Sequence, residues 1–521
     1  MLMCVALAVL WCVPAVCVGF RGDFPLNDDW AFARAAEVLA ETGRFERVPW
    51  MYALGYTHVA AGAAALAVSP LESSYETLRV LTWLCGLAGT FGVFALARRL
   101  GAEPVAASAA AATLALNALY TNLAFTFMSD VPFIALCTWS LYFWASPPER
   151  RVGGRILALL LAVAATLSRQ PGAALVVAYA ISLALPALRT RRRWLVASST
   201  LVAAAAVVWV AARTTAPASR AAPFGVIGFA QQLLGPYVAY FEARHASVAF
   251  VYLGVFLAPL AVMVRPENAA RARRMAMLGL AATLASLAAL AATGLRMPLG
   301  LNMLHGAGVG PIAISGRELL EPLPAAFWWA LTALGLASAF WLTGCALAAQ
   351  RAREFVAERD AARIAIVAFA LVYLGVVGAR SPCFDRYLLV PLAPLAALLA
   401  SHAHPSHARR LAAALLLAAF GLFGTLGLAD YLAFQRARWG LLTPLVARGV
   451  APERIDGGFE FGGRYLFGPK FRWVVDDEFV VALQPQLDGY RAIGAERFRR
   501  RLVPGTRVVT LYERAGASER R

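Results

Sequence analysis

The chain has 521 residues, of which 60% are hydrophobic and 15% are charged. Soluble globular proteins contain roughly 45–50% apolar and 25% charged residues, so this composition excludes a string of soluble domains and predicts a polytopic membrane protein. The formal net charge is +18, but we expect no nucleic-acid partner, because the basic residues gather in short clusters between apolar stretches, as the positive-inside rule requires of membrane proteins.

Fourteen segments are candidates for membrane-spanning helices, which need about 20 mostly apolar residues. They are residues 1–20, 51–68, 78–97, 104–122, 130–146, 155–168, 171–188, 194–212, 246–264, 275–293, 325–349, 364–379, 386–401 and 410–429. The first begins without a basic residue and its apolar run is longer than that of a signal peptide, so we expect it to be the first span.

The distribution of arginine decides how segment 51–68 is interpreted. If this segment does not cross, the loops that begin near residues 98, 149, 189, 265, 351 and 401 share one side and together carry 19 arginines. If it did cross, later clusters such as Arg191–Arg193 would face outward, against the positive-inside rule. We therefore predict about thirteen spans with the N-terminus inside. Segment 51–68 would fold against the outer side of the bundle or dip into it.

The same alternation predicts the domain organisation. Residues 1–429 form a transmembrane catalytic domain in this interpretation, with 21–77 as its first outer loop. The connections 213–245 and 294–324 also lie outside, and the latter could form a mobile flap over the site. Residues 430–521 contain only short apolar stretches and paired glycines. We expect them to form a small extracytoplasmic α+β domain.

The first outer loop contains the sequence Asn27-Asp28-Asp29-Trp30 and continues to Gly43. Its apolar and charged residues fall on opposite faces of a helix, which predicts an amphipathic helix at the membrane surface. Asn27 or Asp28 fits the N-cap, and Gly43 fits the position after the last turn. The two aspartates could simply cap the helix and favour its dipole. Alternatively, a carboxylate held ionised there could accept a proton from an acceptor hydroxyl.

Further charged residues lie at the predicted outer ends of spans. Arg169, Arg380 and Arg386 could bind a phosphate, because arginine is a planar and always-ionised donor. They could equally snorkel at the interface or form pairs, for example Arg386 with Asp385. Asp130 could orient the hydroxyl that Asp28 contacts, bind a divalent cation together with Asp28, or cap the following span. No set of metal ligands has a spacing that predicts a metal site, and the seven cysteines are not paired in the sequence.

Several short motifs resemble those of one enzyme family. They are the paired acids of the first outer loop, Phe127–Phe133, Ser168–Gly172 and Phe384–Leu392. In this context the chain resembles the GT-C glycosyltransferases, and more narrowly the family 39 group, which includes protein O-mannosyltransferases and the aminoarabinose transferase of lipid A. The resemblance implies a mainly α transmembrane bundle of GT-C type.

The resemblance also implies an activity and roles for individual residues. Such enzymes transfer a sugar from a polyprenyl-phosphate-linked donor to an acceptor outside the cytoplasm. The first acid of the pair is the base in those relatives, which corresponds to Asp28, while Asp29 replaces the commoner glutamate. Asp130 joins them in the catalytic group. The residues expected to hold the lipid phosphate are Arg169, Gln170, Arg380, Arg386 and Tyr387.

We therefore expect a multi-pass glycosyltransferase of the bacterial inner membrane, with its site on the extracytoplasmic side. Its partners would be the donor lipid, the bilayer and an acceptor that is a lipid, a protein or a polysaccharide. The alternatives are a transporter or flippase of lipid-linked sugars, a surface-polysaccharide ligase or polymerase, and a non-catalytic binding protein. A transporter would place its charged residues at mid-span, whereas here they gather at span ends.

Overall fold

The structure is a computed structural model. It describes residues 2–46, 48, 51, 54–187, 236–265, 269–299, 302–348, 361–378, 384–467 and 477–515. The expected span 194–212, most of the connection 213–245 and Arg380 lie outside these residues.

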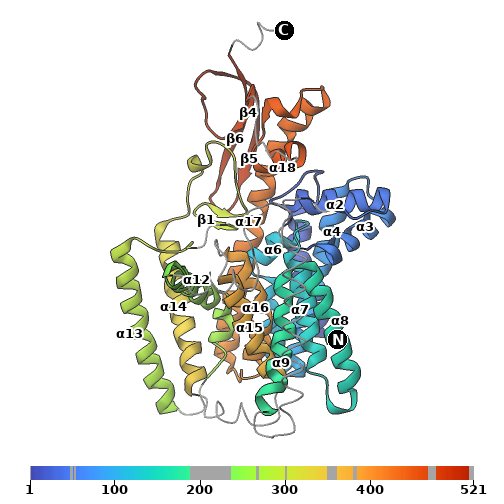
Figure 1. Cartoon of the computed structure of the whole chain (residues 1–521). Coiled ribbons are helices and arrows are strands. Elements are labelled where there is room, and N and C mark those ends of the chain that lie inside the picture. Colours follow the sequence, from blue (N-terminus) through green and yellow to red (C-terminus); the bar gives the residue numbers. More distant parts are fainter. Residues whose placement is uncertain are drawn as a thin grey trace.

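Helices make up most of the described chain, and strands are confined to the segment before α14 and the region after α17 (Figure 1). The helices are α1 (Leu2–Val18), α2 (Asp29–Thr42), α3 (Tyr56–Val68), α4 (Ser74–Arg99), α5 (Pro104–Ala115), α6 (Ala118–Ala124), α7 (Asp130–Trp144), α8 (Arg151–Ser168), α9 (Ala173–Ala187), α12 (Pro236–Ala261), α13 (Ala269–Thr293), α14 (Ala325–Ala348), α15 (Ala361–Gly378), α16 (Leu389–Ala400), α17 (His407–Ala447) and α18 (Phe459–Leu466). The strands are β1 (Leu304–His305), β2 (Gly308–Val309), β3 (Ile455–Asp456), β4 (Phe479–Ala482), β5 (Tyr490–Arg500) and β6 (Gly505–Arg514).

The long helices stand side by side in one bundle. Six helices of the described chain are long and apolar enough to cross a membrane, and five shorter apolar helices accompany them. Helix α4 packs against α5 and α7, α12 packs against α14, and α9 packs against α15. The outward face of α1 leaves large apolar side chains such as Val9 and Val16 exposed, which suits contact with lipid and not with water. The expected mainly α transmembrane fold is confirmed.

One expected span is interrupted. Segment 104–122 was expected to form a single helix, but α5 ends at Ala115 and α6 begins at Ala118. The side chain of Asn117 accepts hydrogen bonds from the backbone N–H groups of Leu119 and Tyr120, at 3.0 and 3.4 Å. Asn117 therefore caps a new helix, which is the physical reason for the break.

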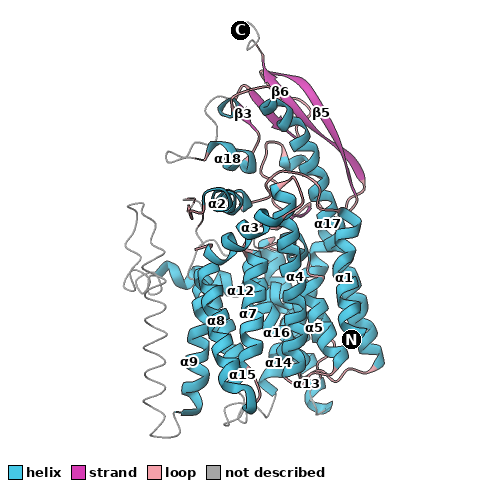
Figure 2. Cartoon of the chain, turned by 90° about the vertical axis from the view of Figure 1, so that its right-hand side faces the viewer, coloured by secondary structure: helices cyan, strands magenta, loops and turns pink. Residues whose placement is uncertain are grey.

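Helices α2 and α3 lie beside each other across one end of the bundle, below strands β3–β6 (Figures 1 and 2). We call this the sheet end. Helix α3 has 13 residues and is therefore about 20 Å long, less than the roughly 30 Å of hydrocarbon that a span must cross. Gly62 lets α3 approach closely, because a Cβ there would lie 2.4 Å from the Phe127 ring. As expected, Gly43 ends α2 in the left-handed conformation, with φ of 68°.

The C-terminal region is carried by α17. This helix has 41 residues, and its outer part contacts β5. The expected domain boundary between residues 429 and 430 falls inside this continuous helix. The helix continues past this point because the residues that follow, such as Leu432 and Phe434, are still buried in the core. The sheet has the order β3-β4-β6-β5, in which β3 and β4 are parallel and the other pairs antiparallel. Together with α18 it forms an α+β unit.

Candidate active site

Asp28 lies directly before α2, and its carboxylate faces Arg386. It occupies the N-cap position, but its side chain makes no capping hydrogen bond. Instead, Oδ2 of Asp28 lies 3.3 Å from Nη2 of Arg386. The Asp28 side chain is 23% exposed. Asp28 therefore does not cap α2 with its side chain. Its carboxylate is partly accessible and lies beside the guanidinium of Arg386.

Asp29 is fully buried. Its Oδ1 accepts the N–H of Leu26 at 2.7 Å, and its Oδ2 accepts the N–H of Phe127 at 3.1 Å. Burial raises the pKa of the Asp29 carboxyl to about 7, although the nearby Arg79 and the two hydrogen bonds favour the ionised form. Both carboxylate oxygens of Asp29 therefore accept backbone N–H groups. These two hydrogen bonds join the first loop to the segment before α7.

The same segment is held by a residue that sequence reasoning did not single out. Nε2 of His58 in α3 donates to the carbonyl of Phe127 at 3.0 Å, and the two rings stack with centroids 4.0 Å apart. Burial lowers the pKa of His58 to about 4, so the imidazole is neutral at physiological pH. The only available signal in the sequence was a histidine within an otherwise apolar segment.

Asp130 and Arg169 form a second ion pair. The N-cap of α7 is Ser129, and Asp130 is the first residue of the helix, with 1% exposure. Nη1 of Arg169 lies 2.8 Å from Oδ2 of Asp130 and donates to the Ser129 hydroxyl at 3.3 Å. Arg169 follows the last residue of α8. Its guanidinium carbon lies 5.5 Å from the centroid of the Tyr387 ring.

Arg386 connects the two pairs. It lies in a short 3-10 helix before α16, Asp385–Leu388, and is 5% exposed. Its guanidinium carbon lies 5.7 Å from the Tyr387 ring centroid, so Tyr387 is within reach of both arginines. Nε and Nη1 of Arg386 are buried and make no hydrogen bond of ordinary geometry within the described chain, although the Tyr387 side chain also interacts with this guanidinium. Asp28, Arg386, Tyr387, Arg169 and Asp130 therefore form one cluster.

Asp385 fixes the backbone around this cluster. Its carboxylate accepts the N–H groups of Met303 at 3.1 Å, Leu304 at 2.8 Å and Arg386 at 2.8 Å. Burial raises the pKa of Asp385 to about 6 in spite of these bonds and of the charge on Arg386. The sequence predicts Asp385 only as a possible ion-pair partner of Arg386. Its hydrogen bonds instead join the segment around β1 to the arginine.

The remaining expected residues are less informative. Gln170 begins the short 3-10 helix Gln170–Gly172, directly after Arg169. Arg380 lies outside the described residues. Within the described ranges, no group of three or more histidine, cysteine or acidic side chains is placed to hold a metal ion.

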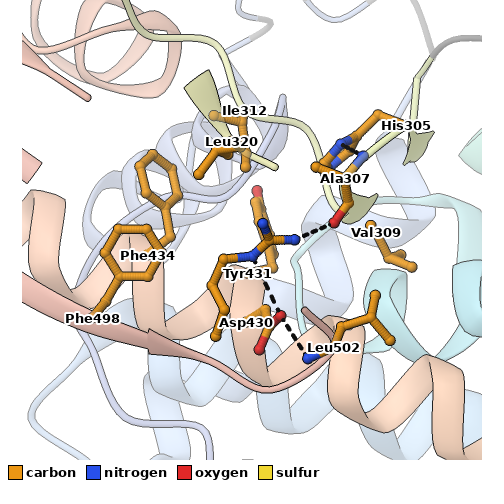
Figure 3. A pocket seen from close by; sticks show the side chains of 13 residues that line it. His305, Ala307, Val309, Ile312, Leu320, Asp430, Tyr431, Phe434, Phe498 and Leu502 are labelled. Atoms are coloured by element: carbon orange, nitrogen blue, oxygen red, sulfur yellow. Dashed lines mark hydrogen bonds and ion pairs between the residues drawn. The ribbon is translucent and has the colours of Figure 1, made fainter. Parts of the chain in front are cut away.

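A separate small pocket lies between the β1–β2 turn, α17 and β5 (Figure 3). Its volume is about 20 Å³, which is room for about one water molecule and too little for a sugar. Arg500 at its wall donates to the carbonyls of Ala307, at 2.5 Å, and Glu321, at 2.9 Å. The pocket therefore marks the contact between the sheet and the segment held by Asp385.

Residues 58–214 match the model of a family described as dolichyl-phosphate-mannose-protein mannosyltransferase. The matched part contains Asp130 and Arg169 but neither Asp28 nor Arg386. The match confirms the expected resemblance to a family of membrane glycosyltransferases. No curated protein matches the chain.

Several solved structures are similar at low sequence identity. ArnT from Cupriavidus metallidurans bound to undecaprenyl phosphate is 15% identical, covers 99% of this chain and 98% of its own, and has a TM-score of 0.39. The apo state of the same protein is 16% identical over 98% and 97% of the two chains, with a TM-score of 0.35. The apo oligosaccharyltransferase from Archaeoglobus fulgidus is 14% identical over 83% of this chain and 57% of its own, with a TM-score of 0.45.

Proposed function

We propose that the protein is an integral-membrane glycosyltransferase that moves a sugar from a polyprenyl-phosphate-linked donor to an acceptor hydroxyl. The family match supports this class of reaction, because the family is described by a lipid-phosphate-linked sugar donor. The acceptor would be a lipid, a protein or a polysaccharide. The site would lie at the outer face of a bacterial inner membrane, and the distribution of arginine supports an extracytoplasmic position of the sheet end.

The observation that carries the proposal is the state of Arg386. Its guanidinium is almost completely buried, and two of its nitrogen atoms make no hydrogen bond of ordinary geometry within the described residues. Buried N–H groups without acceptors are unfavourable in a folded protein. A phosphate offers several oxygen acceptors and is bound by arginine in a bidentate way. A lipid phosphate at this position would therefore satisfy the donors.

The chemistry assigns Asp28 to the acceptor side. The acceptor oxygen attacks the anomeric carbon, the bond from this carbon to the phosphate oxygen breaks, and its electron pair remains on the phosphate. The phosphate is a good leaving group whose growing charge needs cationic stabilisation more than protonation. Arg386 would supply that positive charge. On donor binding, its guanidinium would leave the Asp28 carboxylate and bind the donor phosphate instead. Asp28 would then be free to accept the proton of the acceptor hydroxyl.

Arg169 would bring a second positive charge to the donor phosphate. Its ion pair with Asp130 at 2.8 Å fixes the direction of its guanidinium. The ring of Tyr387 contacts the guanidinium groups of both Arg169 and Arg386. Asp29 and His58 act through the backbone of Phe127, which lies shortly before Asp130. We assign them a positioning role.

The arrangement favours surface chemistry over transport. Asp28 precedes α2, Arg169 follows α8, and Arg386 precedes α16. All three therefore lie at helix ends, whereas a transporter places its binding charges at broken helices near mid-membrane.

The test compares lipid-linked sugars and surface glycans between wild-type cells and a strain that lacks the gene. We expect one polyprenyl-phosphate sugar to accumulate and one glycan to disappear. The accumulated lipid is then purified and given to the purified protein with membranes of the deletion strain as acceptor. Release of free polyprenyl phosphate with transfer of the sugar supports an enzyme. Accumulation in cells without any cleavage by the purified protein would instead identify a flippase.

A further inference from the structure

The hairpin formed by β5 and β6 reaches from the sheet down to the bundle. Strand β5 runs along α17: Phe498 packs against Phe434 with ring centroids 5.7 Å apart, and Nε of Arg500 lies 3.7 Å from Oδ2 of Asp430. In Figure 2 the long arm of the sheet ends beside α17, near the upper end of α1. The turn between the strands is therefore the part of the sheet that lies nearest to the bundle.

Three exposed arginines lie on this arm. Side chains alternate along a strand, so Arg497 and Arg499 point opposite to Phe498 and Arg500, and Arg501 follows at the turn. All three are exposed, and none forms an ion pair with another described residue. By contrast, Arg491 at the far end of β5 pairs with Glu513 at 3.0 Å. Arginines without an ion pair among the described residues are thus concentrated at the end of the hairpin that approaches the bundle.

The height of this end is fixed by Asp430. The carboxylate of Asp430 accepts the backbone N–H groups of Arg501 at 2.5 Å and Leu502 at 3.1 Å. Arg436 lies six residues further along α17, which is about 9 Å along a helix axis. It donates to the carbonyls of Val18 at 3.1 Å and Gly19 at 3.2 Å, at the end of α1.

The end of α1 marks the edge of the lipid-facing surface. Val16 is 83% exposed, as expected for a side chain in hydrocarbon. Because Arg436 lies beyond Asp430 and reaches the last residues of α1, the turn bound to Asp430 lies at about the level of this edge. A bilayer that covers the exposed apolar side chains of α1 would have its headgroups at this level.

We propose that Arg497, Arg499 and Arg501 form a docking surface for the phosphate groups of anionic phospholipids. We call it the hairpin stripe. Guanidinium groups bind phosphate oxygens well, and basic side chains at the headgroup level are attracted by an anionic surface. The inference does not depend on sugar transfer.

The contacts of Arg500 give the docking a structural consequence. Arg500 lies between two members of the stripe and donates to the carbonyls of Ala307 and Glu321. The same segment begins with Met303 and Leu304, whose N–H groups are bound by Asp385. The hairpin that carries the stripe is therefore joined, through Arg500, to the segment that lies against the candidate site.

The test uses the full chain with a photoreactive amino acid, p-benzoylphenylalanine, at the exposed Thr506. Thr506 is opposite Arg499 in the hairpin. The protein is placed in nanodiscs of phosphatidylcholine alone or of equal parts phosphatidylcholine and phosphatidylglycerol, and lipid adducts are identified by mass spectrometry. We expect phosphatidylglycerol adducts to exceed phosphatidylcholine adducts at least about fivefold in the mixed nanodiscs, since one basic residue at an anionic surface changes binding by about this factor.

Three variants make the outcome decisive. The combined change Arg497→Gln, Arg499→Gln and Arg501→Gln should abolish the preference for phosphatidylglycerol adducts. Lysine at the same three positions should keep most of this preference, because the charge remains. The control Arg491→Gln should leave it unchanged. Equal labelling of the two lipids by wild-type protein would overturn the proposal. So would an absence of lipid adducts, or labelling of a soluble polyanion such as heparin in their place, which would identify a polysaccharide-binding surface.

Discussion

Asp28 and Asp29 are neighbours in the chain, yet the Asp28 carboxylate lies 3.3 Å from Arg386 while both oxygens of Asp29 are bound to backbone N–H groups. Asp28 is the residue before α2 and Asp29 is its first residue, and their side chains leave the backbone in different directions. One is partly exposed beside a cation, and the other is buried. The paired acids thus have separable roles, and each role leads to a different experiment.

Replacing Asp28 by Asn should abolish sugar transfer. The amide has the same shape but cannot accept the hydroxyl proton, and loss of a general base typically lowers the rate by about 10²- to 10⁴-fold. Binding of polyprenyl phosphate should persist, because Arg386 remains. Turnover and lipid binding are measured on the purified protein. The control is Glu41→Gln at the exposed end of α2. Unchanged turnover in the Asn variant would remove Asp28 from the role of base.

Replacing Arg386 by Gln should weaken binding of polyprenyl phosphate by about 10- to 100-fold, because a hydrogen bond to a charged group contributes about 1.5–3 kcal/mol. Replacement by Lys should give an intermediate affinity, since Lys keeps the charge but loses the bidentate geometry. Titration calorimetry in detergent measures both. The exposed Arg34 in α2 supplies the control, Arg34→Gln. If both Arg386 variants bind the lipid as tightly as the wild type, the phosphate is held elsewhere.

Arg169 and Asp130 should show strong energetic coupling. Asp130 is 1% exposed, and its carboxylate lies 2.8 Å from Arg169. Removal of one partner from a buried ion pair costs about 3–5 kcal/mol, because the other charge is left without compensation. Asp130→Asn and Arg169→Gln should each lower the thermal midpoint of unfolding. The decrease in the double variant should be clearly smaller than the sum of the two single decreases. Strict additivity in thermal unfolding followed by circular dichroism would mean that the two side chains do not form this pair.

The bundle, the surface helix and the candidate acids follow from local features of the sequence. Long apolar segments predict the bundle, and the pattern from Asp28 to Gly43 predicts α2 with its terminus. These features depend only on residues close together in the chain. The break before α6 was missed, because the capping residue Asn117 lies inside an apolar run whose hydropathy favours one continuous helix.

The partners within the site could not be predicted in the same way. The contact between Asp28 and Arg386 joins residues 358 positions apart. The contact of Asp385 with Leu304 joins residues 81 apart. Such contacts depend on how helices cross at the sheet end, and the sequence alone contains no local signal for them. For the same reason, the assignment of Asp29 to backbone support required the three-dimensional position of Phe127.

His58 should affect catalysis through position and not through proton transfer. In the variant His58→Phe the ring can still stack on Phe127, but the carbonyl of Phe127 loses its donor. An unsatisfied buried group costs about 1–3 kcal/mol, so we expect a lower thermal midpoint and a reduced kcat, with little change in KM for the donor. The pH profile of kcat should keep its shape. A profile that shifts with this variant would show that His58 itself exchanges a proton during turnover.

Asp29 should make the stability of the protein depend on pH. Burial raises the pKa of its carboxyl to about 7 from an ordinary value of 3.8, with Arg79 and Glu460 as nearby charges. The folded state therefore holds this proton more tightly than the unfolded state. The stabilisation is complete below about pH 4 and is lost as the pH rises through about 7, by about 4 kcal/mol at most. The side chain in the variant Asp29→Asn cannot ionise, so the thermal midpoint of this variant should fall less than that of the wild type between these pH values, whatever its absolute stability.

The control variant Glu41→Gln should show the same change in thermal midpoint with pH as the wild type. Parallel curves for the wild type and the Asn variant would mean that Asp29 is already ionised in the folded protein, and the positioning role would then rest on a carboxylate held by Arg79 and the two backbone N–H groups.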